Sequence, residues 1–150
     1  MTRRWLYVVC ALLSASLFAI SVWIGQWWTV GEVAWGPLGT RRCFSGDCRG
    51  SGLSWTGGSD LWERSAVATW VAGLVAMVVL MGLAAGVASG RAPKLIARTT
   101  LVAIATAIVV AAYFVMAAPA IPGASIGQGV ILFAVAVVAG VVPAVRVLRA

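Results

Sequence analysis

Four long apolar stretches without a charged residue constrain this chain more than any other feature of its sequence. They cover residues 5–24, 65–89, 99–118 and 124–145. A helix rises about 1.5 Å per residue, so about 20 residues cross the hydrocarbon core of a bilayer. In lipid, only helices and closed barrels satisfy every backbone hydrogen bond, and these stretches lack the alternation of barrel strands. The sequence therefore predicts an all-α membrane protein, a single domain (1–150) built as a four-transmembrane-helix bundle.

The composition excludes a soluble domain and several classes of enzyme. Hydrophobic residues make up 62% of the chain and charged residues only 10%, whereas soluble domains are nearer half apolar and a quarter charged. The chain has no histidine, the commonest general base and metal ligand. No charged side chain lies within an apolar stretch, where proton relays and ion pathways carry theirs. We therefore expect a protein that is not an enzyme, with no catalytic residue, metal site or cofactor.

The positive charges lie on one side of the predicted spans. The chain ends and the link between the second and third spans carry the whole net charge of +7, on Arg3, Arg4, Arg91, Lys94, Arg98, Arg146 and Arg149. The positive-inside rule makes these segments cytoplasmic. We expect a multi-pass protein of the cell (inner or plasma) membrane, with both termini inside and the first loop outside. Topology alone accounts for the basic face; attraction to anionic lipid or an acidic partner is the alternative, and no nucleic-acid partner is expected.

The extracellular loop over residues 25–64 is long enough to form a structure of its own. Residues 27–35 place β-prone side chains at alternating positions, and Gly36-Pro37 then ends the pattern. A second short strand is expected around residues 53–56. These stretches predict a small extracellular antiparallel β-sheet in the first loop.

Tryptophan is concentrated in the first half of the chain. All eight tryptophans precede residue 72. Near the ends of the spans such rings prefer the membrane interface, so we expect most of the following to be interface anchors: Trp5, Trp23, Trp27, Trp28 and Trp62. Trp35 and Trp55 lie deeper in the loop and are expected to pack its small core.

Two of the three cysteines lie in the extracellular loop. Cys43 and Cys48 flank a tight Gly-Asp turn, and Cys10 lies near the cytoplasmic end of the first span. Outside the cell, thiols close in sequence form disulfides, and closing this loop would add roughly 2 kcal/mol. We predict a structural disulfide between Cys43 and Cys48 and a free Cys10. A membrane thiol oxidoreductase is the alternative, although such enzymes use CxxC pairs.

Glycines recur every fourth residue at the end of the second span. Gly82, Gly86 and Gly90 would lie on one helical face, where small residues let helix backbones approach closely in lipid. The pattern indicates packing within the bundle or, alternatively, contact with a helix of a partner.

The order of these features resembles the layout of the claudin superfamily, which includes claudins, peripheral myelin proteins and calcium-channel gamma subunits. That layout has four helices with cytoplasmic ends and a first loop with an early tryptophan, a Gly-Leu-Trp element, two cysteines, and an arginine before the second helix. The resemblance covers the chain from end to end, with the segment Trp-Gly-Pro-Leu-Gly in the place of Gly-Leu-Trp. The matching positions are Trp28 (or Trp27), the segment Trp35, Gly36, Pro37, Leu38 and Gly39, then Cys43, Cys48 and Arg64. The excess of arginine over lysine, with abundant Ala, Val and Gly, indicates a GC-rich, bacterial relative.

The resemblance implies a non-enzymatic protein that binds other proteins. We expect self-assembly or binding of another membrane protein through the extracellular loop and the helix faces, with membrane lipids around the bundle. Within the loop, an open edge strand and an Arg41-Arg42 tip are the expected contact. The alternatives are a small accessory subunit of a larger complex, the thiol oxidoreductase, and a loop that merely shields the end of the bundle.

Overall fold

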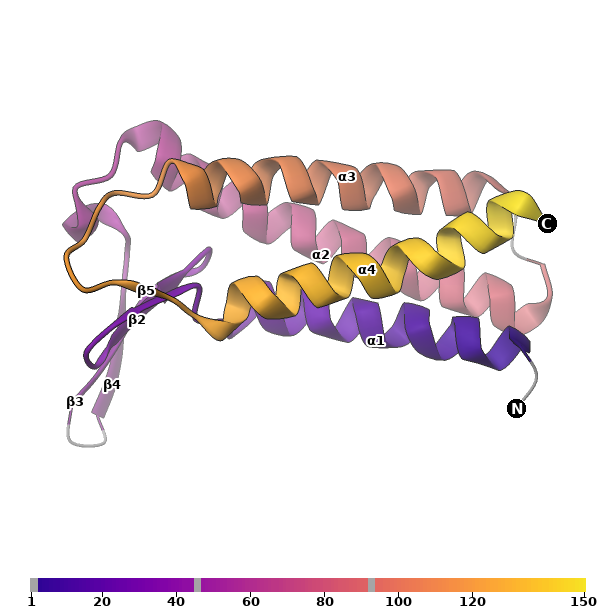
Figure 1. Cartoon of the computed structure of the whole chain (residues 1–150), viewed down its shortest axis with the longest axis horizontal. Helices are drawn as coiled ribbons and strands as arrows, with labels where there is room; N and C mark the ends of the chain where they lie inside the picture. The colour runs from indigo at the N-terminus through magenta and orange to yellow at the C-terminus, as the bar shows by residue number, and fades with distance from the viewer. Residues whose placement is uncertain (1–2, 45–46, 92–93) are drawn as a thin grey trace.

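The computed structural model describes residues 3–44, 47–91 and 94–150, with side chains from residue 4 onward. The centre of the predicted Gly-Asp turn, residues 45–46, lies outside the described residues. Four long helices lie side by side, and a small sheet crosses one end of the bundle (Figure 1). The elements, in order, are α1 (Arg3–Trp23), β1 (Trp28–Val30), β2 (Val33–Gly36), β3 (Gly39–Phe44), β4 (Asp47–Ser51), the 3₁₀ turn η1 (Ser54–Thr56), α2 (Asp60–Ser89), α3 (Lys94–Met116), β5 (Ser125–Ile126) and α4 (Gln128–Arg149).

The structure confirms the predicted set of four long apolar helices with a small antiparallel sheet between the first and the second. Each helix is long and apolar enough to cross a membrane, with a mean hydropathy of 2.1 to 2.5 in its most apolar window. Helix α2 begins at Asp60 rather than near residue 65, because the Ser59 side chain accepts a hydrogen bond from the N–H of Trp62 and caps the helix. Helix α4 begins at Gln128 rather than near residue 124, because the residues before it form β5.

Small residues and buried hydroxyl groups form the seams of the bundle. Helix α1 packs against α2 and α4, and α2 against α3. Ser14 and Ser21 of α1 donate to the carbonyl oxygens of Ala136 and Gly129 on α4, at 2.6 and 2.8 Å. An added Cβ at Gly140 would lie 2.6 Å from the Ser14 hydroxyl. The helices therefore approach where neither carries a bulky side chain.

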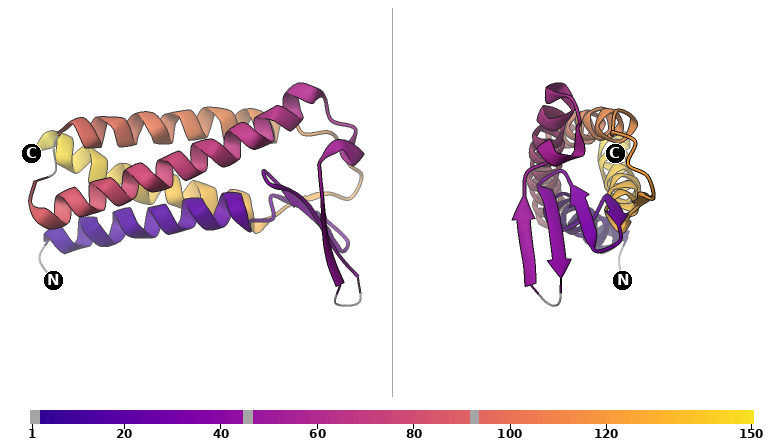
Figure 2. Two further views of the ribbon diagram at one scale, coloured as in Figure 1. Left: turned by 180° about the vertical axis from the view of Figure 1, so that it is seen from behind. Right: turned by 90° about the vertical axis from the view of Figure 1, so that its left-hand side faces the viewer.

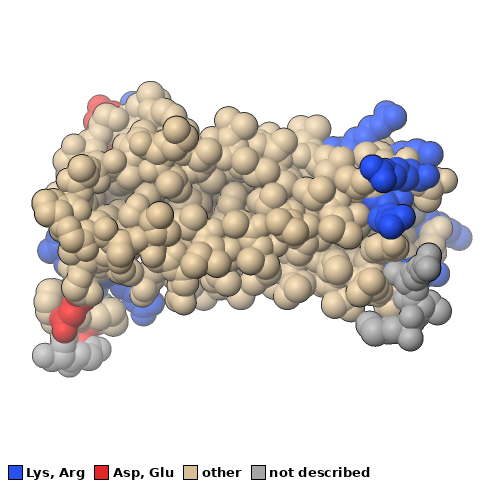
Figure 3. All heavy atoms as spheres, viewed as in Figure 1, with Lys and Arg blue, Asp and Glu red and all other residues tan. Residues whose placement is uncertain are grey.

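One end of the bundle, here called the basic end, gathers most of the positive charge. Both chain termini lie there, and Figure 3 shows Lys and Arg side chains grouped at this end, with an uncharged surface along the bundle in that view. The exposed members are Arg4, Arg91, Lys94, Arg98, Arg146 and Arg149. Arg4 Nε donates to the Val87 carbonyl at 2.8 Å. The Gly90 N–H donates to the same carbonyl, so this group in the last turn of α2 accepts two hydrogen bonds.

The opposite end, here called the sheet end, carries the five-stranded antiparallel sheet. The strand order is β4-β3-β2-β1-β5. Residues 27–35 form two strands, β1 and β2, joined through Gly31, which has a φ of 55°. The fifth strand comes from the link between α3 and α4, where the sequence showed no strand signal. The strand predicted over residues 53–56 is wrong: the segment is a 3₁₀ turn, closed by a hydrogen bond from the Thr56 N–H to the Leu53 carbonyl.

An aromatic cluster joins the sheet to the helices. Trp27 is 1% exposed, and its ring lies 5.4 Å from that of Phe133 and 5.7 Å from that of Phe114. Trp62 is 0% exposed and stacks on Phe114. Trp28 is also buried, against Phe114 and Trp35.

Interface anchoring is therefore wrong for Trp27, Trp28 and Trp62, because tertiary packing buries their rings. Trp5 and Trp23 are more than half exposed, at 51% and 57%. Only these two of the expected anchors keep their rings on the surface, where interface anchoring requires them.

The close packing between the helices predicts that two Gly→Ala substitutions change the stability of the fold in opposite directions. Gly140→Ala places a methyl group against Ser14 and Ile104 and should destabilise the fold by about 1–3 kcal/mol through overpacking. Gly82→Ala meets nothing within 4 Å and should stabilise by up to about 1 kcal/mol through helix propensity. Unfolding midpoints of the purified protein in detergent measure both. Equal unfolding midpoints for the two variants would contradict the close packing of Gly140 against Ser14.

Candidate functional site

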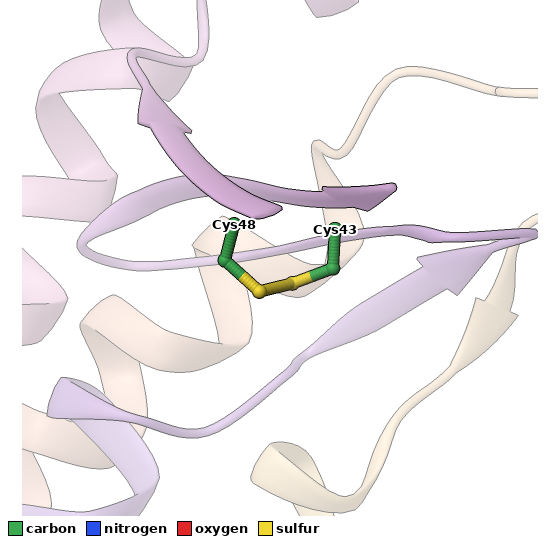
Figure 4. The surroundings of a disulfide bond; sticks show 2 residues. All are labelled: Cys43 and Cys48. Atoms are coloured by element: carbon green, nitrogen blue, oxygen red, sulfur yellow. A yellow bond between two sulfur atoms is a disulfide. The ribbon is translucent and has the colours of Figure 1, made fainter. Parts of the chain in front are cut away.

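A disulfide clamps the hairpin formed by β3 and β4. Cys43 and Cys48 stand opposite one another in the register and are bonded, with a Cα–Cα distance of 4.1 Å (Figure 4). The predicted disulfide is thereby confirmed, and Cys10 is a free, half-buried thiol. The hairpin extends sideways beyond the helices, so it stands apart from the rest of the sheet end (Figure 2).

Strand β4 is an open edge of the sheet. All five of its residues are exposed, and its only neighbour in the strand order is β3. The short Cα–Cα distance at the disulfide is typical of a non-hydrogen-bonded pair. The Cys43 N–H accordingly donates to the Glu32 carbonyl, on the β2 side. Because pair types alternate, Cys48 and Gly50 direct their backbone N–H and C=O groups outward, away from β3.

The two arginines predicted as the loop tip lie elsewhere, in the middle of β3. Arg41 stands opposite Ala34 and Gly50, and Arg42 opposite Val33 and Arg49. Successive side chains of a strand point to opposite faces. The two arginines therefore do not form the predicted tip, and they are divided between the two faces of the sheet.

The face that carries Arg42 is partly covered by η1. The Arg42 guanidinium lies 5.1 Å from the centre of the Trp55 ring, a cation–π contact. Trp55 Nε1 donates to the Thr40 hydroxyl at 2.6 Å, so the ring is fixed over β3. Arg49 lies directly across from Arg42. Like charges at this spacing repel each other.

The residues matched to the claudin layout lie mostly beside this hairpin. Trp28 and Trp35 stack with their ring planes 12° apart, inside the sheet end. Gly36 is buried, since an added Cβ would lie 2.7 Å from the Gly25 carbonyl oxygen. Leu38 is exposed in the turn between β2 and β3. Arg64 is exposed on the second turn of α2, near Asp60 and Glu63, and belongs to no strand.

The glycines of α2 form a separate feature, nearer the basic end. Gly82 is exposed, and open space surrounds its Cβ position. Gly86 is half-buried. Gly90 is no part of the helical face: it is the C-cap, with a φ of 72°, beside the Arg4 guanidinium. The three-residue face predicted from the spacing is therefore wrong at Gly90, because the helix ends before it.

The described residues hold no group of three or more Asp, Glu, His or Cys side chains that a metal ion requires. The disulfide lies at the sheet end, whereas Cys10 lies in α1 towards the basic end. A relay of electrons between them would have to run along more than half of α1. Sequence reasoning missed β5 and the Arg42–Trp55 contact, because neither has a local sequence signal.

Removing the disulfide should loosen the hairpin and spare the helices. In a Cys43→Ser/Cys48→Ser variant we expect the hairpin to lose roughly 2 kcal/mol of local stability, because the unfolded loop gains conformational entropy when the disulfide is absent. Amide hydrogen exchange over residues 40–51 should quicken, with exchange in α1–α4 unchanged. Cys10→Ser is the matched control. Accelerated exchange throughout the helices would show instead that the bundle depends on the hairpin.

Comparison with known proteins adds no relative. No protein-family model, curated protein or solved structure matches this chain. The geometry of its own residues must therefore carry any assignment of function.

Proposed function

We propose that this chain is a multi-pass membrane protein of claudin-like build that binds other proteins through the β3–β4 hairpin. The proposal rests on the open edge of β4. A disulfide joins this strand to β3, and the hairpin extends beyond the helices (Figure 2). Unpaired N–H and C=O groups on a strand edge readily pair with another chain. The activity is non-enzymatic and the partner is a second copy or another membrane protein.

Two observations support a membrane location with both chain ends in the cytoplasm. Large aliphatic side chains such as Leu13, Val78 and Val109 are more than half exposed along the helices, where water would penalise them and lipid would not. The arginine-rich end lies opposite the sheet (Figure 3). Basic segments stay in the cytoplasm, so the sheet end is extracellular, in the compartment where disulfides persist.

The orientation is tested by cysteine labelling in intact cells. In a Cys10→Ser background, a membrane-impermeant maleimide should label a Ser54→Cys variant at the sheet end and leave an Ala150→Cys variant unlabelled. Both positions are exposed, so accessibility within the fold is matched. Permeabilised cells should label both. Labelling of position 150 in intact cells would reverse the topology.

A second candidate is a small accessory subunit that packs along a partner helix. The open space around Gly82 favours it, since an exposed helical glycine lets a second backbone approach closely. The two candidates use different surfaces, so substitutions at Gly82 and on β4 separate them.

The edge is tested by a proline that removes one outward N–H. Gly50→Pro deletes a donor on the free side of β4 and leaves the β3–β4 ladder intact. We expect partner binding to weaken about 3- to 10-fold, the value of one net hydrogen bond. Gly50→Ala is the matched control, because it keeps the N–H and its Cβ meets only the Thr40 carbonyl oxygen at 3.9 Å.

The measurement is the size and composition of the tagged protein purified from its membrane in mild detergent. The parent and Gly50→Ala should run larger than the 15.5 kDa chain, as an oligomer or with a stoichiometric partner. Gly50→Pro should shift towards the monomer. An assembly unchanged by Gly50→Pro but lost in Gly82→Leu would favour the accessory subunit over the hairpin.

A further inference from the structure

A cleft lies beneath the part of the sheet that overhangs α1. Its volume is about 740 Å³, within the range of small-molecule sites. One wall is the end of α1, with Trp23 and Ile24, and the other is the sheet, with Ala34, Arg41 and Gly50. Figure 2 shows the strands crossing the end of the bundle and running past α1. The cleft therefore lies at the level where α1 ends.

The wall formed by α1 is apolar and exposed. Trp23 is 57% exposed and Ile24 is 63% exposed. They end the first candidate span, so in the membrane they would lie where hydrocarbon meets the headgroups. A hydrocarbon chain lying along the end of α1 would therefore contact this wall of the cleft.

The sheet wall carries one charge. Arg41 is the only charged residue among those that line the cleft, and it is exposed. Its cross-strand neighbours on that face are Ala34 and Gly50, which are too small to cover the guanidinium. All four acidic residues of the chain are described, and none lines the cleft. Gln26, Thr40 and Ser51 are uncharged polar residues of the same lining.

We propose that this cleft binds the phosphate headgroup of an anionic phospholipid in the outer leaflet. Arg41 contacts the phosphate in the paired geometry that guanidinium groups favour, and the start of an acyl chain lies along Trp23 and Ile24. A free phosphate ion would use Arg41 alone, whereas a lipid uses both walls. The site rests on the membrane location proposed above and uses one face of the hairpin, whereas the proposed protein contact uses the free backbone groups along the β4 edge.

Photocrosslinking of the full chain in nanodiscs of phosphatidylcholine and phosphatidylglycerol tests the site. A phosphatidylglycerol with a diazirine in its headgroup should label residues 23–26 and 48–52. Labelling should fall about tenfold in Arg41→Gln, which loses a charge-assisted contact. Arg42→Gln, the matched control on the opposite face of β3, should label like the parent. Equal labelling of Arg41→Gln and the parent would overturn the proposal.

A second variant and a second probe distinguish failure of the lipid site from failure of the membrane location. Gly50→Leu places a large side chain in the cleft, so it should lose headgroup labelling. A diazirine in the middle of the acyl chain should label the exposed helix faces of every variant. Absence of that labelling overturns the membrane location and the site together, whereas headgroup failure alone overturns only the site.

Competition identifies the source of the phosphate. Excess inorganic phosphate should displace little of the lipid, because the lipid is held by both walls of the cleft whereas a free ion contacts Arg41 alone. If it abolishes the labelling, the cleft is a soluble-anion site and the lipid assignment is wrong. Crosslinks from the cleft to a second copy of the chain in place of lipid would also overturn it.

Discussion

The burial of Trp27 between the sheet and the helices is the contact on which the shape of the sheet end depends. The residue follows α1 and precedes β1, and its Nε1 donates to the Ser21 carbonyl, which α1 leaves free near its end. Its ring contacts Phe114 of α3 and Phe133 of α4. Glycine at positions 36 and 129 leaves room for the ring, since a Cβ at either would lie within 3.2 Å of it. One side chain thereby fixes the sheet relative to three helices.

The placement of the sheet then decides which polar groups are available. Because β1 and β2 are held over the bundle, β3 and β4 continue beyond it, and their two faces meet different surroundings. Arg42 lies against Trp55, while Arg41 lies in the cleft beside α1. The disulfide restrains the hairpin, since a two-stranded ribbon alone is marginally stable in water. The proposed protein contact and the proposed lipid contact thus occupy the edge and one face of the same hairpin.

Two tryptophans have a buried indole N–H without a hydrogen-bond acceptor in the part of the chain that the structure describes. Nε1 of Trp35 is buried without a partner among the described residues, as is Nε1 of Trp70. An unsatisfied buried donor costs about 1–3 kcal/mol. Trp35 is stacked on Trp28 and lies edge-on to Trp55, and such aromatic pairs contribute about 0.5–1.5 kcal/mol each. The ring contacts therefore offset the missing hydrogen bond and keep Trp35 within the sheet.

The sequence alone determined the four helices, the location of the sheet and the disulfide partners. Long charge-free runs and two cysteines close in sequence are local properties, which need no knowledge of the fold. Tertiary structure alone decided the rest. Two residues before α4 become β5 only because β1 lies beside them. Trp27 and Trp28 are buried because α3 and α4 present phenylalanines to them. The face of the sheet on which Arg41 lies depends on the strand register. A shift of one residue would move every side chain of the strand to the opposite face. Register is set by cross-strand packing rather than by composition.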